Sequence, residues 1–207
     1  MTYDVLVVGA GNAAMCAALA AEETGASVLV IERAPSDLRG GNTAFTAGAM
    51  RVAYRGVDDI QALVPDLSPE QLAITDFGRY TVDQFYDDMG RISEYRTDPE
   101  LAHALASESF ETLLWMRDKG VRFVPIYGRQ AFRENGKFTF WGGLTLEAVG
   151  GGPGLVEALS AALERRSVKI EYGVRLVSLI ADDTGVHGAQ VKSEGHTREI
   201  AARTVVL

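Results

Sequence analysis

A short apolar run followed at once by a glycine turn constrains the fold of this chain more than any other feature. Residues 5–8 have the length and the β-branched character of a buried parallel strand. Gly9, Gly11 and Ala14 come next, in Gly-x-Gly-x-x-Ala spacing, and the Ala- and Leu-rich residues 13–23 predict a helix. Strand, glycine turn and helix in this order predict the first half of a dinucleotide-binding unit.

A second strand that ends in an acid completes this unit. Residues 27–31 predict another buried strand, and Glu32 stands at its end, 21 residues after Gly11. Gly9 permits the tight turn, and Gly11 lets the backbone approach a pyrophosphate, whose charge is favoured at a helix N-terminus. Glu32 can accept hydrogen bonds from both hydroxyls of an adenosine ribose, and its charge disfavours the 2′-phosphate of NADP. A glycine turn without any ligand is the alternative interpretation.

Composition and charge exclude several classes of protein. With 47% hydrophobic and 23% charged residues, the 207-residue chain is typical of a soluble globular protein. Its net charge of −8 argues against nucleic acid or an anionic membrane surface as a partner. The single cysteine, Cys16, cannot form an internal disulfide, which fits the cytoplasm. The start lacks a basic region, and glycines interrupt the first apolar run, so we expect neither a signal peptide nor a membrane span.

The stretch 39–51 is the second informative segment. It reads Arg-Gly-Gly-Asn-Thr-Ala-Phe-Thr-Ala-Gly-Ala-Met-Arg and begins a few residues after Glu32. Glycine turns around small and hydroxyl side chains suit a backbone that lies against a large planar ligand, with its N–H groups directed at that ligand. A plain flexible loop is the alternative. The position directly after the ribose-binding acid favours the ligand.

These motifs together resemble a known flavoprotein superfamily. Residues 9–14, 32–35 and 40–51 are similar to the FAD-binding half of the fumarate reductase/succinate dehydrogenase flavoproteins. The run Gly-Gly-Asn-Thr-x-x-Thr-Ala-Gly-x-x-Arg, with glycine pairs or triplets at 140–143 and 150–152, most resembles the FAD-dependent tricarballylate dehydrogenase branch. The resemblance covers essentially the whole chain.

The resemblance implies a fold and a division of the chain. The expected fold is α/β, a doubly wound, Rossmann-like FAD-binding domain over residues 1–207, truncated at its C-terminus relative to the family. Its expected parts are a dinucleotide-binding unit with the flavin loop (1–51), a helical segment with a hairpin (52–167) and an accessory β-meander (168–207). A capping or substrate domain is not expected in this chain, and catalytic residues are expected beyond residue 207.

The resemblance also implies a set of cofactor-binding residues. They are Gly9, Gly11, Asn12, Ala13, Ala14, Glu32, Arg33, Gly40, Gly41, Asn42, Thr43, Thr46, Ala47, Gly48 and Val174. The glycine turn would hold the pyrophosphate, Asn42 and Thr43 the phosphate and ribityl region, and residues 46–48 would run beside the isoalloxazine ring near N5. Val174 would contact adenine through its backbone. Membrane-bound relatives attach FAD covalently to a histidine at the place of Asn42, so the FAD here is expected to be non-covalent. No metal is expected.

The implied activity is that of an FAD-dependent oxidoreductase. Hydride transfer between flavin N5 and a carbon of a di- or tricarboxylate would make or remove a C=C bond, with a separate electron acceptor or donor as partner. Two alternatives stay open. One is another flavoprotein of the superfamily, such as a 3-ketosteroid dehydrogenase, and the other is an inactive nucleotide-binding fragment.

The middle of the chain is predicted to be mostly helical. Ser68 followed by a proline predicts a helix start, and residues 81–84 resemble a capping box. Residues 98–119 predict a long helix that Gly120 ends. The expected buried stripe of this helix consists of Leu101, Leu105, Phe110, Leu113, Leu114 and Met116.

The last third of the chain combines glycine motifs with strands. Asn135-Gly136 predicts a hairpin between the runs that flank it. Trp141, beside two glycines, either packs on a ligand or covers the core. The glycine run 150–154 opens a helix predicted over 155–165, and it either receives an anion or serves as a flexible joint. Strands are predicted over 168–172, 175–181, 186–193 and 197–207.

Overall fold

The computed structural model describes residues 2–207, apart from the side chain of Arg129. The chain forms two compact units. The first runs through Thr46 and resumes at Gly152–Leu207, and the second is Ala47–Gly151. These limits differ from the expected segment limits at 51 and 167. The end of the flavin loop belongs to the second unit, whereas the helix after the glycine run belongs to the first.

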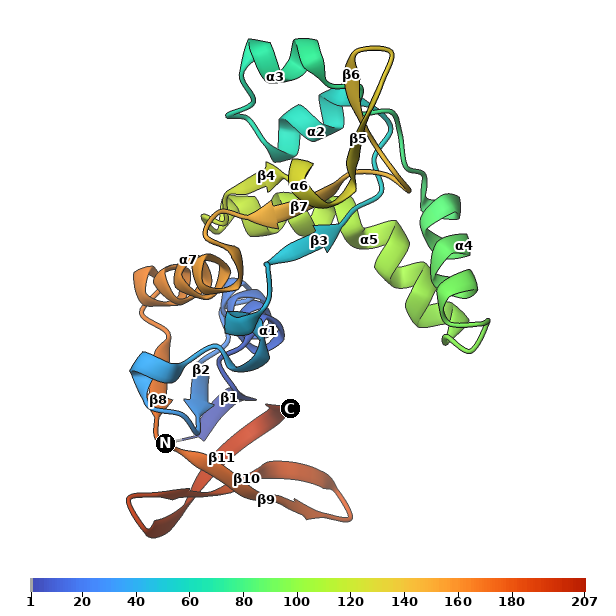
Figure 1. Ribbon diagram of the computed structural model, residues 1–207. Coiled ribbons are helices and arrows are strands. Elements are labelled where there is room, and N and C mark those ends of the chain that lie inside the picture. Colours follow the sequence, from blue (N-terminus) through green and yellow to red (C-terminus); the bar gives the residue numbers. More distant parts are fainter. Residues whose placement is uncertain (1) are drawn as a thin grey trace. The chain divides into compact units, whose positions relative to one another are not determined.

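The first unit is built around one six-stranded sheet (Figure 1). Its strands are β1 (Thr2–Val8), β2 (Val28–Glu32), β8 (Lys169–Tyr172), β9 (Arg175–Asp182), β10 (Gly185–Ser193) and β11 (His196–Val206). Their order is β8-β2-β1-β11-β10-β9. The first four strands in this order run parallel, and β9, β10 and β11 are joined antiparallel. The expected α/β fold with a parallel sheet is therefore confirmed.

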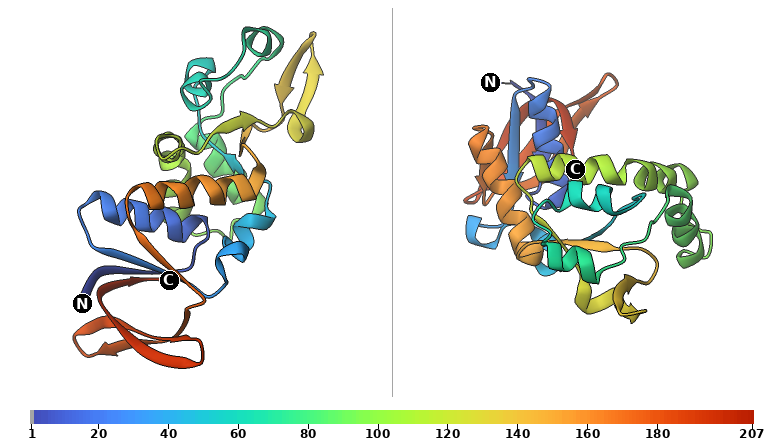
Figure 2. Two further views of the ribbon diagram at one scale, coloured as in Figure 1. Left: turned by 90° about the vertical axis from the view of Figure 1, so that its left-hand side faces the viewer. Right: turned by 90° about the horizontal axis from the view of Figure 1, so that it is seen from above.

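Different layers cover the two faces of the parallel strands. Helices α1 (Asn12–Glu23) and α7 (Gly151–Arg165) lie over one face, while β9, β10 and the part of β11 that pairs with β10 curve beneath the other (Figure 2, left view). Alternation along the strands divides the apolar side chains between the two layers. The core between sheet and meander is formed by Leu6, Leu29, Ile31, Val174, Ala189, Val191, Ile200 and Ala202.

The meander is part of the main sheet. β8, expected to begin the meander, pairs in parallel with β2, and β11 pairs in parallel with β1. The register brings Glu32 opposite Tyr172, and Val7 opposite Val206. Within the meander, glycine at 188 permits the antiparallel β10–β11 pairing, since a Cβ there would lie 2.1 Å from the Ile200 carbonyl oxygen. Sequence periodicity predicts each strand but not the parallel pairing of β8 and β11 with the main sheet.

The second unit combines short strands with helices. Its strands are β3 (Ala49–Arg51), β4 (Phe123–Pro125), β5 (Ala131–Glu134), β6 (Lys137–Phe140) and β7 (Thr145–Ala148). Its helices are α2 (Val57–Leu63), α3 (Pro69–Ile74), α4 (Val82–Ile92), α5 (Pro99–Asp118) and α6 (Tyr127–Gln130). The predicted helix starts are confirmed, because Ser68 and Thr81 both form complete capping boxes and Asp98 caps α5.

The predicted buried face of α5 is partly wrong. Leu101 and Leu105 are 70% and 57% exposed. The buried positions are instead Ala102, Ala106, Ser109, Leu113 and Met116. Ser109 explains the shift, because its Oγ accepts the backbone N–H of Ala53 at 3.0 Å and draws that face of the helix toward the segment after β3. Small side chains on this face allow the close approach.

The predicted hairpin is confirmed. β5 and β6 pair antiparallel, and Asn135 and Gly136 both have positive φ angles, as a two-residue turn of this kind requires. Trp141 is 79% exposed and covers no core. Gly143 has a packing role, because a Cβ there would lie 2.5 Å from Cγ of Tyr80. No helix among residues 2–207 is long and apolar enough to cross a membrane.

Candidate functional site

A cleft of about 540 Å³ opens at the carboxyl edge of the parallel strands. Val8, Ile31 and Leu207 line it, and these residues lie at or next to the ends of β1, β2 and β11. Val174, which follows the end of β8, also lines it. The strand order switches direction at β1, because the strand that follows it in the chain, β2, lies on one side of it and β11 lies on the other. Ligands of open α/β sheets bind at such a switch point, and the volume suits an extended small molecule.

Most of the predicted cofactor residues line this cleft. They are Gly9, Gly11, Asn12, Ala13, Ala14, Glu32, Arg33, Gly40, Gly41, Asn42, Thr43 and Val174. Thr46, Ala47 and Gly48 are not among its lining residues. Sequence reasoning missed Arg175 and Leu176, at the start of β9, since nothing in their local pattern shows that this strand reaches the glycine turn. Direct contact with a cofactor stays a prediction for every one of these residues.

The glycine turn leaves helix amides free at the cleft. Gly9 has φ +112°, which favours glycine, and its N–H donates to the Ile31 carbonyl at 2.7 Å. The first helical amide, of Asn12, donates to Thr43 Oγ1 at 3.0 Å. The next two amides, of Ala13 and Ala14, find no acceptor within the described part of the chain. Two free N–H groups at the positive end of α1 fit a pyrophosphate.

Glu32 is a buried carboxylate at the end of β2, only 9% exposed. Its Oε2 accepts the backbone N–H of Ala10 at 2.8 Å, and its Oε1 accepts that of Ala34 at 2.7 Å. A carboxylate offers about four acceptor sites, so both oxygens keep capacity for two ribose hydroxyls. The side chain therefore joins the glycine turn to the end of β2 and also fits the predicted ribose contact.

The predicted adenine contact at Val174 meets a constraint. The backbone N–H of this residue donates to the carbonyl of Glu32 at 2.9 Å. Val174 is 4% exposed, and its side chain belongs to the core between sheet and meander. Its N–H is therefore already engaged, so a backbone contact to adenine would use the carbonyl oxygen.

The loop 39–46, which carries Asn42 and Thr43, lies along one face of α7. Gly40 has φ +101°, and a Cβ there would meet Val156 Cγ2 at 2.6 Å. Gly152 donates its N–H to the Thr46 carbonyl at 2.9 Å. A Cβ at Gly152 would lie 2.0 Å from the Thr43 carbonyl oxygen. Positions 152, 156 and 160 recur every fourth residue, so they form one stripe.

This packing explains the glycine run before α7. The sequence left two interpretations open, an anion site and a flexible joint. α7 begins at Gly151, four residues earlier than predicted, and its first turn is held against the loop 39–46 by the Gly152–Thr46 hydrogen bond. The glycine at 152 is thus required for a close approach of two backbones, a role that neither interpretation included.

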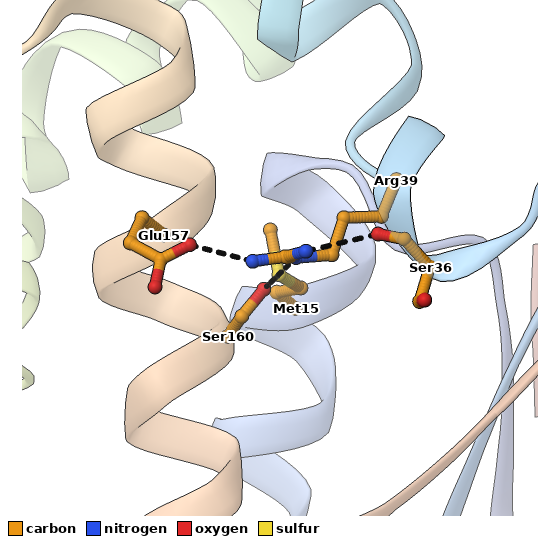
Figure 3. A network of polar contacts seen from close by, with 5 residues as sticks. All are labelled: Met15, Ser36, Arg39, Glu157 and Ser160. Atoms are coloured by element: carbon orange, nitrogen blue, oxygen red, sulfur yellow. Dashed lines mark hydrogen bonds and ion pairs between the residues drawn. The ribbon is translucent and has the colours of Figure 1, made fainter.

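Arg39 fastens the start of this loop (Figure 3). Its Nη2 lies 2.5 Å from Glu157 Oε2, and its Nε donates to Ser160 Oγ at 3.3 Å. Its Nη1 donates to the Ser36 carbonyl at 2.9 Å. Ser160, which is buried, donates in turn to Met15 Sδ on α1 at 3.5 Å. One guanidinium therefore connects the loop with α7, and through Ser160 with α1.

Cys16 lies one turn after Asn12 on α1. Its Sγ donates to Asn12 Oδ1 at 3.5 Å, a weak bond that orients the amide of a cleft residue. Burial raises the pKa of the Cys16 thiol to about 11. The folded protein therefore favours the neutral thiol. Its contribution to stability is complete below pH 9 and is lost as the pH rises toward 11.

We expect Cys16 to resist alkylation in the folded protein. Raising its pKa from 9.0 to about 11 lowers the thiolate fraction at pH 8 about 100-fold, and burial limits access further. The measurement is the rate of iodoacetamide labelling at pH 8, by mass spectrometry, in buffer and in urea. Equal rates in the two conditions would contradict the expectation.

Known proteins share this architecture. A family model described as an FAD binding domain matches residues 4–207. The chain is 28% identical over 215 residues to a probable fumarate reductase, Ifc3, of Shewanella frigidimarina (strain NCIMB 400), covering 100% of this chain and 32% of that protein. It is 26% identical to a 3-oxo-5-alpha-steroid 4-dehydrogenase of Comamonas testosteroni, covering 95% and 34%.

A solved structure agrees with these relatives. The open conformation of a flavocytochrome c3 fumarate reductase superposes with a TM-score of 0.73 at 27% identity, covering 100% of this chain and 33% of that one. The chain therefore spans about a third of the length of the relatives it matches.

Proposed function

Because this chain belongs to the FAD-binding domain family, its cofactor is FAD, and we propose that the cleft at the carboxyl edge of the sheet holds it without a covalent bond. One observation carries the proposal. The free amides of Ala13 and Ala14 and the buried carboxylate of Glu32 line the same cleft, as a pyrophosphate and a ribose require.

Each part of the cleft has a proposed task. The amides at the start of α1 bind the pyrophosphate, and Glu32 orients the ribose. Asn42 and Thr43 contact the phosphate and ribityl region. Residues 46–48, which follow in sequence but do not line the cleft itself, are proposed to run beside the isoalloxazine ring. The Thr43 hydroxyl accepts the Asn12 amide at 3.0 Å, so its own proton is available to a ligand.

We propose that the protein acts as an FAD-dependent oxidoreductase on a CH–CH bond of a di- or tricarboxylate. Bound FAD supplies hydride transfer at N5, and the protein's part is to hold the ring, exclude water and place the substrate carbon. The fumarate reductase relatives support this class and the flavoprotein superfamily. The motif at 40–51 supports the tricarballylate dehydrogenase branch. A separate electron acceptor or donor completes the reaction.

A 3-ketosteroid dehydrogenase is the second candidate. The relative from Comamonas testosteroni, whose name states a steroid substrate, matches 95% of this chain. The two candidates differ in substrate charge, so the assay separates them. Purified protein with FAD and an artificial electron acceptor would be given tricarballylate, succinate and a 3-ketosteroid in parallel.

We also propose a cytoplasmic location, because the chain's only cysteine, Cys16, has no second cysteine to pair with.

The cofactor test is direct. We expect the purified chain to be yellow, or to become so on adding FAD, and to release all the pigment as free FAD when denatured by heat. Asn42, in place of an attachable histidine, is the reason for complete release. Pigment that stays with the precipitate would contradict non-covalent binding. A colourless chain that ignores added FAD would overturn the binding proposal and favour an inactive fragment.

A further inference from the structure

We propose that Arg39 is a positioning residue for the flavin, acting through the loop 39–46 and not by touching the cofactor. The inference rests on the proposed FAD site. Arg39 does not line the cleft, whereas Gly40, Gly41 and Asn42, which follow it directly, all do. Its guanidinium points to α7, where it pairs with Glu157 (Figure 3).

The loop needs such an anchor because of its own backbone. Gly40 and Gly41 have φ angles of +101° and +50°, and glycine residues are free to leave these conformations. Within the loop, Thr43 donates to the Gly40 carbonyl at 3.1 Å and Thr46 to the Thr43 carbonyl at 3.2 Å. These are single turns that fray easily without support.

Arg39 supplies that support with three separate contacts. Its Nη2 pairs with Glu157, its Nε donates to the buried Ser160, and its Nη1 donates to Ser36 on its own side of the loop. The guanidinium is half-buried, with 28% of the side chain exposed. A planar fork can satisfy acceptors in three directions, whereas an ammonium is a single point of charge. Lysine is therefore expected to restore the function only in part.

These contacts raise the affinity for the cofactor by holding the loop 39–46 in its bound conformation in advance. A loop already held in its bound shape loses less entropy when the ligand arrives. Replacing Arg39 removes these contacts but leaves every residue that lines the cleft chemically unchanged. Arg39 should therefore affect how tightly FAD binds and how fast it dissociates, and not which groups bind it.

The test compares Arg39→Gln, Arg39→Lys and Glu157→Gln with a matched control, Arg166→Gln. Arg166 also lies next to α7 and pairs with Glu22 and Glu23 of α1, and neither of these ion pairs among the described residues involves the loop 39–46. Two quantities would be measured on the full chain. One is amide hydrogen exchange of residues 40–46 without FAD, and the other is the dissociation constant for FAD, with the unfolding temperature recorded for each variant.

We expect Arg39→Gln to accelerate exchange in the loop and to raise the FAD dissociation constant about tenfold or more, with Arg39→Lys intermediate. Glu157 is 71% exposed, so Glu157→Gln should leave the unfolding temperature nearly unchanged and raise the dissociation constant about threefold. Arg166→Gln is expected to lower the unfolding temperature without changing the affinity for FAD.

The outcomes separate this proposal from the cofactor proposal. If the unaltered chain binds no FAD, the proposed FAD site is wrong. Amide hydrogen exchange of residues 40–46 in the Arg39 variants then still shows whether the Arg39 contacts order the loop. If the unaltered chain binds FAD but Arg39→Gln and Glu157→Gln bind it equally well, the positioning role is overturned. A fall in unfolding temperature with unchanged affinity would likewise reduce Arg39 to a structural residue.

Discussion

Gly152→Ala is expected to unfold the loop 39–46 from α7 and to abolish tight FAD binding. The added Cβ would lie 2.0 Å from the Thr43 carbonyl oxygen and 2.7 Å from that of Thr46. Both neighbours are backbone atoms, so one segment must move by an ångström or more. Such overpacking costs about 3 kcal/mol of unfolding free energy, and the displaced loop carries Asn42 and Thr43 out of position. Urea unfolding and FAD titration would measure the two effects.

Gly128→Ala is the matched control for this substitution. Gly128 lies in α6, and a Cβ there would meet nothing within 4 Å. Alanine in a helix is expected to be neutral or slightly stabilising. Should Gly152→Ala match the control in both stability and FAD affinity, the close approach of α7 to the loop 39–46 would be wrong.

Glu32→Gln is expected to weaken FAD binding and to destabilise the protein even without FAD. Both oxygens of the carboxylate accept backbone N–H groups, from Ala10 and Ala34. Glutamine keeps one acceptor, and its NH2 group would face the other N–H donor in a buried site. An unsatisfied buried donor costs about 1–3 kcal/mol of unfolding free energy. Loss of the charged bonds to ribose should cost a further 1–3 kcal/mol, roughly, of binding free energy.

The control here is Glu171→Gln, on the neighbouring strand. Glu171 is also half-buried, and Lys169 and Arg198 pair with it away from the cleft. Its replacement should leave FAD affinity unchanged whatever it does to stability. Differential scanning fluorimetry without FAD, and fluorescence titration with FAD, give the two numbers. An unchanged dissociation constant in Glu32→Gln would remove Glu32 from the site.

Features that depend on a few adjacent residues were predictable. The strand–glycine turn–helix–strand unit, the caps at Ser68 and Thr81, and the Asn135-Gly136 turn are each decided by local backbone preferences. The predicted cofactor residues around the glycine turn gather for the same reason, because β1, α1 and β2 are consecutive. Their placement follows from one short segment.

The predicted buried face of α5 was partly wrong, because tertiary packing and not local periodicity decides which face of this helix is buried. Leu101 and Leu105 are good members of an apolar stripe, yet the helix turns its small residues and Ser109 inward. The Ser109 hydroxyl meets the Ala53 amide, 56 positions earlier in the chain. Hydrophobic periodicity weighs side chains by transfer free energy and contains no information about such a partner.

By itself, then, the sequence determined the dinucleotide-binding unit, its cofactor class and the positions of most helices and strands, because those signals act over a few residues. Only the tertiary structure decided the strand order β8-β2-β1-β11-β10-β9, the second use of Glu32 as a link between backbone amides, and the requirement for glycine at 152. Each of these depends on segments more than twenty residues apart coming within contact distance. Close packing in the folded chain selects such contacts, and no local pattern encodes them.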